Sequence, residues 1–137
     1  MKIADAMTRD VKLTDSTESI RDAAKRMAEL DVGVLPVGEN DKLIGMIADR
    51  DIAIRAVAQD KPPGATRVRD VMTDRILYCY DDEEIEKANE NMERLGIRRM
   101  PIIDRQKRLA GILSLGDLSF TQTERSGTTL KSVARPH

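Results

Sequence analysis

A pattern of roughly sixty residues occurs twice in this chain, and this repeat limits the possible folds more than any other feature. Matched residues lie 65 positions apart at first, and 66 apart after one extra residue in the second copy. The pairs are Asp5 and Asp70, Met7 and Met72, Thr8 and Thr73, Glu18 and Glu83, Pro36 and Pro101, Leu43 and Leu109, Gly45 and Gly111, and Asp51 and Asp117. A duplication explains them. Since sixty residues alone bury too little surface for comfortable stability, we expect two units that share a core.

Each copy contains an apolar stripe with steps of three and four residues, which predicts an amphipathic helix. The stripe comprises Ile20, Ala23, Ala24, Met27 and Leu30 in the first copy, and Ile85, Ala88, Met92 and Leu95 in the second. We interpret it as core rather than as a cofactor site. The cap candidates are Asp15, Ser16 and Thr17 for the first helix, and Asp81 with Glu84 for the second.

Short apolar runs surround the predicted helices. Two runs separated by a polar turn follow each helix and predict hairpins, of residues 34–37 with 43–48 and of residues 100–103 with 109–114. A shorter run precedes each helix, at residues 11–13 and 76–80, and a further helix is expected to start at Asp51 and near Asp117. The order in each copy is strand, helix, strand, strand, helix, and the fold class is α/β (α+β).

The same pattern suggests domain boundaries. Residues 1–60 form the first predicted unit and residues 68–120 the second, with 61–67 as a linker because Pro62, Pro63 and Gly64 break any helix there. Residues 121–137 are polar, which predicts a mobile tail. An arm that binds a partner is the alternative for this tail.

Charge and hydropathy exclude several classes of function. The chain has 23 Lys and Arg against 24 Asp and Glu, so no net field favours nucleic acid or an anionic membrane. No apolar stretch approaches the ~20 residues that span a bilayer, and the first residues are too polar for a signal peptide. We therefore expect a globular protein in the cytoplasm.

Cysteine and histidine, the usual residues of reactive and metal sites, are scarce. Cys79 is the only cysteine and lies between two tyrosines in an apolar run, which predicts a buried thiol in a strand rather than a nucleophile. His137 is the only histidine and the last residue. Metal sites and histidine-based acid–base catalysis are therefore not expected, and neither is a catalytic cofactor.

Three motifs recur in order in both copies: Met-Thr near the start, an apolar segment with Pro in the middle, and Gly followed by Asp at the end. Residues 1–120 thereby resemble a tandem pair of CBS domains (a Bateman module), in particular the small stand-alone bacterial CBS-domain proteins. The resemblance implies two α/β units packed through their sheets about a pseudo-twofold axis, and a homodimer. It also implies a non-catalytic regulatory role in signal transduction. In that role an adenosyl ligand (AMP, ADP, ATP or S-adenosylmethionine) binds in clefts between the units and a protein target responds.

In CBS pairs, each cleft combines the Asp and hydroxyl of one copy with the opening strand and Pro-containing segment of the other. By this resemblance, cleft A comprises Ser114, Asp117, Lys12, Leu13, Thr14, Val32, Gly33, Val34, Leu35 and Pro36. An Asp in the first turn of a helix offers two acceptor oxygens to ribose hydroxyls, and the helix start offers amides to a phosphate. Ser114 adds a hydroxyl, and Gly33 allows close backbone approach. Cleft A is the preferred adenosyl site.

Cleft B, by the same resemblance, comprises Asp51, Ile76, Leu77, Tyr78, Ile97, Arg98, Arg99, Met100 and Pro101. Ala48 stands where the other copy has Ser114, which removes a hydrogen bond worth roughly 1 kcal/mol, or about fivefold in affinity. An arginine can compensate by pairing with a phosphate. Since adjacent strand side chains point to opposite faces, one of the two arginines reaches the cleft, and the resemblance favours Arg98.

Simpler interpretations of these residues stay open. In the simpler interpretation, Asp51 and Asp117 are helix caps with no role in ligand binding, and Arg98 and Arg99 are solvated surface residues. Lys12 either reaches a phosphate or is exposed. The family often has Thr followed by an apolar residue at the opening strand, and Lys12-Leu13-Thr14 departs from this, so the adenine pocket of cleft A stays open too.

Two other classes of function compete with the sensor. A structural or protein-interaction module with degenerate clefts is favoured slightly by Ala48, and predicts that the Asp51 and Asp117 variants keep function whereas tail deletion does not. An enzyme would use carboxylates such as Asp49, Asp51 and Asp104. With no available histidine, no Cys-His pair and no metal-ligand cluster, there is little on which to build a catalytic site.

Overall fold

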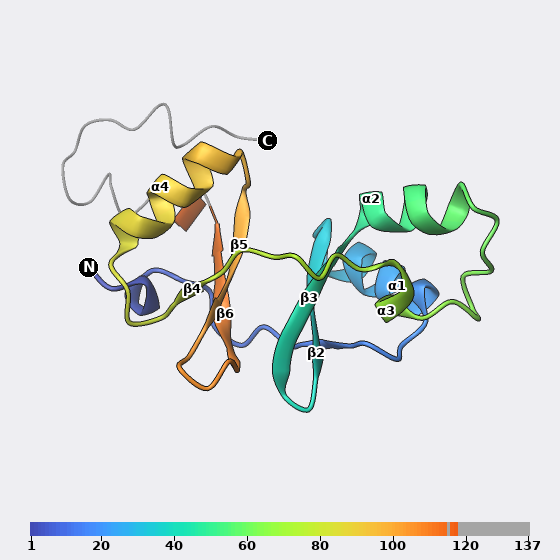
Figure 1. The fold of residues 1–137 in the computed structure, drawn as a ribbon, viewed down its shortest axis with the longest axis horizontal. Coiled ribbons are helices and arrows are strands. Elements are labelled where there is room, and N and C mark those ends of the chain that lie inside the picture. The colour runs from blue at the N-terminus through green and yellow to red at the C-terminus, as the bar shows by residue number, and fades with distance from the viewer. Residues whose placement is uncertain (115, 118–137) are drawn as a thin grey trace. The chain divides into compact units, whose positions relative to one another are not determined.

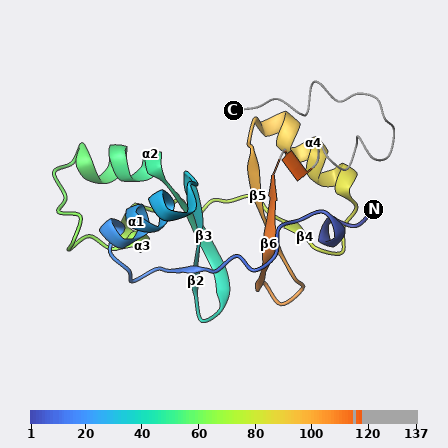
Figure 2. The same cartoon turned by 180° about the vertical axis from the view of Figure 1, so that it is seen from behind.

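The computed structural model describes residues 1–114, 116 and 117, and the chain forms two compact units (Figures 1 and 2). The first-repeat unit is Lys12–Ile76. The second-repeat unit combines Met1–Val11 with the described residues from Leu77 onward. Residues 121–137, for which the sequence predicts a mobile tail, lie outside the described part of the chain.

The first-repeat unit is a three-stranded sheet with helices to one side of its hairpin, as both views show (Figures 1 and 2). Its strand order is β1-β2-β3, with β1 parallel and β3 antiparallel to β2. The elements are β1 (Thr14–Asp15), α1 (Ile20–Leu30), β2 (Val34–Glu39), β3 (Lys42–Ala48), α2 (Asp49–Ile52), the π-helix η2 (Ala53–Val57) and α3 (Val68–Val71).

The second-repeat unit has the same plan. Its sheet has the order β4-β5-β6, again with one parallel and one antiparallel pair. The elements are the 3-10 helix η1 (Ile3–Asp5), β4 (Cys79–Tyr80), α4 (Ile85–Leu95), β5 (Arg99–Ile103) and β6 (Leu109–Ser114), and residues 116 and 117 are helical. The predicted α/β class and both predicted hairpins are confirmed.

Each unit has a core of its own. In the first-repeat unit, buried residues of α1 pack with Leu35, Val37 and Ile47 of the hairpin and with Val68 and Val71. In the second-repeat unit, buried residues of α4 pack with Met100, Ile102 and Leu113 and with Ile3 and Met7. Each repeat completes the core of its unit with the opening segment of the other repeat, since residues 1–11 and 68–73 are exchanged.

Short backbone pairings hold the exchanged segments in place. Thr8 and Ile112 exchange two hydrogen bonds of 2.8 and 3.0 Å, and Thr73 and Met46 exchange two of 2.8 and 2.9 Å. Figure 1 shows the blue N-terminal segment beside the elements of the second repeat. The predicted linker 61–67 therefore separates the repeats along the chain, but it lies within the first-repeat unit.

The repeated Gly of the motif has a physical reason in these pairings. A Cβ at Gly45 would lie 2.7 Å from the Thr73 carbonyl oxygen, and a Cβ at Gly111 would lie 2.5 Å from that of Thr8. Real Cβ atoms essentially never come that close to backbone. The Met-Thr and Gly motifs therefore recur together. The backbone of each Met-Thr segment lies so close to the strand that only glycine, which has no Cβ, fits at the facing position.

The opening strands differ from their predicted positions. β1 pairs only Thr14 and Asp15 with β2, so the predicted strand at residues 11–13 is wrong, and β4 occupies only the end of the predicted run 76–80. Hydrophobicity marked these runs, but the parallel register to the neighbouring strand decides where pairing occurs. The helix predicted from Asp51 starts two residues earlier, at Asp49.

The predicted helix caps are also wrong. The N-cap of α1 is Ser19, whose Oγ accepts a hydrogen bond from the Asp22 N–H, and the N-cap of α4 is Glu84, whose side chain makes no capping bond. Asp15 belongs to the preceding turn, where its carboxylate accepts from the Thr17 N–H at 2.8 Å. The acidic and hydroxyl residues near a helix start resemble caps in sequence although they stabilise this turn.

The apolar stripe of each helix is core along most of its length. Ile20, Ala23 and Met27 are buried, as are Ile85, Ala88 and Met92. Leu30 and Leu95, at the C-terminal ends, are 58% and 43% exposed, and Ala24 is exposed. The stripe therefore extends beyond the stretch of helix that the unit's own core covers.

Candidate functional site

A carboxylate lies three residues after the last residue of the hairpin in each unit. Asp51 Oδ2 accepts a hydrogen bond from the Ala48 N–H at 2.8 Å, and Asp117 Oδ2 accepts one from the Ser114 N–H at 3.0 Å. Ser114 Oγ in turn accepts from the Asp117 N–H at 3.2 Å, which completes a capping box. Ala48 has no hydroxyl, so the first copy has only half of this box.

The second oxygen of Asp51 has neighbours of its own. Thr73 Oγ1 donates to Asp51 Oδ1 at 3.3 Å, and Arg55 Nε lies 3.9 Å from the same oxygen. Arg55 also donates to the Met72 carbonyl at 2.9 Å, so it links the helix to the exchanged segment. The Asp51 carboxylate therefore helps to hold this segment, in addition to capping its own helix.

Several cleft A residues lie on the sheet face that points away from the core of the first-repeat unit. Leu35 and Val37 point into that core, so Val34 and Pro36 point to the opposite face. Leu13 packs over Gly38, where a Cβ would lie 2.5 Å from Leu13 Cδ1. Gly33 contacts the helix start, because its carbonyl accepts from the Asp49 N–H at 2.9 Å.

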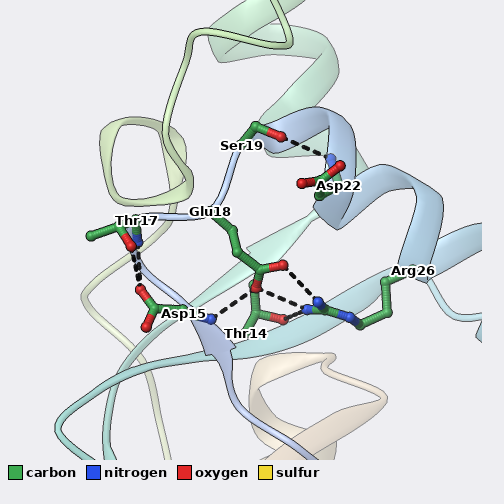
Figure 3. A network of polar contacts seen from close by, with 7 residues as sticks. All are labelled: Thr14, Asp15, Thr17, Glu18, Ser19, Asp22 and Arg26. Atoms are coloured by element: carbon green, nitrogen blue, oxygen red, sulfur yellow. Dashed lines mark hydrogen bonds and ion pairs between the residues drawn. The ribbon is translucent and has the colours of Figure 1, made fainter.

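Thr14 and Val32, also predicted for cleft A, contribute to the interior of their own unit. Thr14 is fully buried, and its Oγ1 accepts a hydrogen bond of 2.9 Å from Arg26. Arg26 also forms two hydrogen bonds, of 2.6 and 3.1 Å, with the Glu18 carboxylate (Figure 3). This pairing raises the pKa of Arg26. Val32 packs against the core, and Lys12 is exposed.

The cleft B residues of the second-repeat unit likewise include both core residues and exposed ones. Met100 lies in the core and Ile97 packs against it, whereas Leu77 and Tyr78 are 47% and 38% exposed. Pro101 is buried. Arg98 and Arg99 are both exposed; Arg99 is paired with Ser114 across the hairpin, and Arg98 precedes the strand. Ile76 is half-buried at the end of the first-repeat unit.

Tyr78 belongs to an aromatic cluster that was not expected from the sequence. The rings of Tyr78 and Tyr80 meet edge to face with centroids 5.7 Å apart, and Arg105 Cζ lies 3.9 Å from the Tyr80 centroid. Arg105 forms two hydrogen bonds with the Asp82 carboxylate, of 2.9 and 2.8 Å. The Tyr-x-Tyr spacing in a strand could have indicated the ring pair, but nothing local indicates the partnership with Arg105.

Cys79 is buried in β4, as predicted. Asn91 Nδ2 of α4 lies 3.8 Å from its Sγ, and burial together with the negative charge of Glu83 raises the pKa of the thiol. A protonated, inaccessible thiol is a packing group rather than a nucleophile.

Within residues 1–114, 116 and 117, no group of three His, Cys, Asp or Glu side chains could hold a metal ion. In the same part of the chain, no helix is both long and apolar enough to cross a bilayer.

Two copies of one α/β unit, with exchanged opening segments and a carboxylate at the same helix start, define a tandem-repeat protein of mixed α/β class. The sequence model of the CBS-domain family matches residues 3–57 and, a second time, residues 68–121. The chain therefore belongs to the CBS-domain family. CBS-pair proteins are regulatory modules. The predicted resemblance is thereby confirmed.

Relatives of similar length support this assignment. The CBS domain-containing protein YhcV of Bacillus subtilis is 37% identical over 134 residues, which cover 96% of this chain and 94% of that protein. A solved CBS domain pair in complex with 5-methylthioadenosine and S-adenosyl-L-methionine has a TM-score of 0.75 and 26% identity, over 92% of this chain and 98% of that one. CBSX2 in complex with AMP has a TM-score of 0.78 and 25% identity, over 90% and 97%.

Proposed function

We propose that this protein is a non-catalytic sensor that binds an adenosyl ligand and passes the change to a protein target. The observation that carries the proposal is the carboxylate repeated at the same helix start, Asp51 in one unit and Asp117 in the other. A carboxylate is an acceptor-only group and matches two vicinal ribose hydroxyls, which are donors. The two neighbours solved with AMP and with S-adenosyl-L-methionine support this class of ligand.

The two carboxylates are expected to contribute unequally. Asp51 Oδ1 already accepts from Thr73 and lies near Arg55, so a ribose has to compete with these groups. Asp117 is accompanied by Ser114, whose hydroxyl accepts from a backbone N–H and still has its proton to donate. Cleft A, which includes Asp117, is therefore our preferred site, and the assignment of residues to clefts A and B stays a prediction.

Calorimetry of the ligand-stripped protein with AMP, ADP, ATP, S-adenosylmethionine and NAD tests the proposal. We expect binding of at least one adenosyl compound, with a larger loss in Asp117→Asn than in Asp51→Asn. Asp60→Asn is a matched control, because Asp60 has a positive φ of 57°, which Asn tolerates, and an exposed side chain. If the folded protein shows neither heat nor a thermal shift at saturating ligand, the sensor function is wrong.

A protein-interaction module with degenerate clefts is the second candidate, and the absent hydroxyl at Ala48 favours it. It predicts that Asp51→Ala and Asp117→Ala leave the regulated activity unchanged in cells. The sensor predicts that at least one of these variants loses its response to ligand.

We also propose that the protein acts in the cytoplasm as a homodimer. Ile54 and Val57, on the helix that follows Asp51, are 52% and 67% exposed, and Leu30 at the end of α1 is 58% exposed. A second copy of the chain would cover these exposed apolar side chains. Light scattering after gel filtration is expected to give a dimer, and a monomer for Val57→Asp. A monomeric wild type would contradict the proposal.

A further inference from the structure

Two tyrosines share the outer face of the second-repeat sheet. Cys79 points into the core, so Tyr78 and Tyr80 on either side of it point to the opposite face. Their rings form a T-shaped pair, with planes at 89° and centroids 5.7 Å apart. This is one of the favoured geometries of aromatic pairs, in which each ring restricts the other. Tyr78 remains 38% exposed, so part of it is accessible to solvent.

Tyr80 is itself held in place by Arg105, which comes from the β5–β6 turn. The guanidinium carbon lies 3.9 Å from the Tyr80 ring centroid, well within the range of a cation–π contact. Asp82 binds the same guanidinium through two hydrogen bonds of 2.9 and 2.8 Å. The planar fork of arginine suits both contacts at once, and lysine cannot reproduce this geometry.

The turn that carries Arg105 is closed by its neighbour Asp104. Asp104 Oδ1 accepts hydrogen bonds from the backbone N–H groups of Gln106 and Arg108, at 2.8 and 3.0 Å. Arg105 therefore starts from an ordered backbone and lies between the carboxylate of Asp82 and the face of Tyr80. A guanidinium that is already paired with a carboxylate is a poor receptor for a phosphate, so its role is to hold the ring.

The first-repeat unit lacks this arrangement at the equivalent position. There Leu13 packs over Gly38, because the glycine leaves space that the leucine fills. The second repeat has Ile103, whose side chain is buried, where the first has Gly38, so the gap beside a glycine is absent from β5. Tyr78, the counterpart of Leu13, is thereby left available on the sheet face.

We infer that Asp82, Arg105 and Tyr80 are positioning residues that orient Tyr78 to stack on the aromatic base of the ligand. This inference rests on the proposed function and deepens it, because it makes the base the part of the ligand that the second-repeat unit recognises. Stacking of a base on an aromatic side chain is a strong, orientation-dependent contact. Arg105 therefore contributes to ligand affinity indirectly, through Tyr80 and Tyr78, and this contribution does not depend on the charge of the ligand.

Fluorine NMR tests this geometry directly, because Tyr78 and Tyr80 are the only tyrosines in the sequence. Protein labelled with meta-fluorotyrosine gives two resonances, and Tyr80→Phe assigns them. Addition of adenosine is expected to shift the Tyr78 resonance, whereas ribose 5-phosphate is not, since it has no base. If calorimetry shows adenosine binding while the Tyr78 resonance stays unshifted, the inference is overturned and the sensor function stands.

The affinities of variants test the positioning role. We expect Tyr78→Ala to weaken adenosine and AMP binding at cleft B, to which Tyr78 is assigned, by on the order of tenfold, and Tyr78→Phe to keep the wild-type affinity of that cleft. Arg105→Ala is expected to weaken both ligands equally, by about threefold, and Arg105→Lys to fall between it and wild type. Gln106→Ala is the matched control, since only the backbone of Gln106 makes the bond that closes the turn.

The remaining outcomes each decide a different point. A loss in Arg105→Ala that appears with AMP and not with adenosine would mean a direct phosphate contact and would overturn the positioning role. An unchanged affinity of cleft B in Tyr78→Ala would overturn the stacking contact. No binding of any adenosyl compound to the wild type would remove the proposed function, and this inference with it. Far-ultraviolet circular dichroism of every variant confirms that the fold is retained.

Discussion

The two units connect the opening strand to the first long helix at equivalent positions but with different chemistry. In the first-repeat unit, Arg26 of α1 reaches down to the buried hydroxyl of Thr14 at 2.9 Å and pairs with Glu18 (Figure 3). In the second-repeat unit, the counterparts 65 positions later are Asn91 and Cys79, which make one contact of 3.8 Å.

The ion pairs differ correspondingly. Glu18 and Arg26 lie eight residues apart and join the turn before the helix to its second turn. Glu83, the counterpart of Glu18, pairs instead with Lys87 at 2.6 Å, only four residues further along the chain. Glu83 also accepts a hydrogen bond of 2.8 Å from the Tyr80 N–H, so both glutamates bind the opening strand, but only Arg26 donates in addition to a buried side chain of that strand, Thr14. The units therefore share a fold but differ in the polar contacts that stabilise it.

The largest effect is expected where the two units are alike. Gly111→Ala and Gly45→Ala place a Cβ 2.5 and 2.7 Å from the backbone of the exchanged segment, so the pairing has to open. We expect a loss of about 2–3 kcal/mol in the free energy of unfolding for each. Gly64→Ala is the control, since its Cβ would meet only the end of the Arg21 side chain. Urea denaturation measures all three, and a near-neutral Gly111→Ala would contradict the account of the exchange.

The next effect distinguishes the units. Arg26→Ala leaves the buried Thr14 hydroxyl without its donor and removes the pairing with Glu18, so we expect a loss of about 2 kcal/mol. Asn91→Ala removes only a weak contact to sulfur, and about 0.5 kcal/mol is expected. Urea denaturation of the two variants gives the ratio of these two losses in the free energy of unfolding. Equal losses would mean that the polar network in the first-repeat unit adds nothing beyond the contact in the second.

Acid is expected to weaken the second-repeat unit first. Hydrogen bonds from Arg105, from Lys87 and from the N-terminal amine lower the pKa of Asp82, Glu83 and Glu84, respectively. In the described part of the first-repeat unit, Asp15 alone has a clearly lowered pKa, through its bonds from Thr17. A carboxyl group whose pKa is lowered by folding stabilises the fold above its unfolded pKa of about 4, and this contribution is lost as pH falls through the folded value.

Amide hydrogen exchange, followed by NMR from neutral pH down to about pH 3, separates the two units. We expect protection in α4 and β5 to fall at a higher pH than protection in α1 and β2. Addition of salt is expected to reduce the difference, because the pairs at Asp82 and Glu84 are exposed and screened. Parallel loss in both units would contradict this prediction.

The smallest effect concerns reactivity rather than stability. Burial raises the pKa of the Cys79 thiol, and only the thiolate reacts with an alkylating agent. We expect iodoacetamide to modify native Cys79 at least about tenfold more slowly than the urea-unfolded chain, as measured by mass spectrometry.

Cys79→Thr places the residue of the first repeat, Thr14, at the equivalent position of the second. This variant is expected to be less stable than wild type unless Asn91→Arg accompanies it.

The regular elements could be predicted well from the sequence because their signals are local. The three- and four-residue steps from Ile20 to Met27 record which helix face is buried, and the alternation around Pro36 and Pro101 records two hairpins. The caps were harder, because Asp15 and Ser19 have the same chemistry and only the turn geometry separates them. Among the candidate site residues, the carboxylates of Asp51 and Asp117 lie at helix starts, as their position after the hairpins indicated, while Thr14 is buried beneath Arg26.

By itself, the sequence determined the duplication, the α/β class and the family, since each depends on residue types repeated at constant spacing along the chain. Only the tertiary structure decided that the opening segments are exchanged between the repeats and that Arg105 lies over Tyr80. These contacts join residues far apart in sequence, and they depend on close backbone approach and ring geometry. A pattern along one chain does not record such distances, because the same residues would give the same pattern with or without the contact.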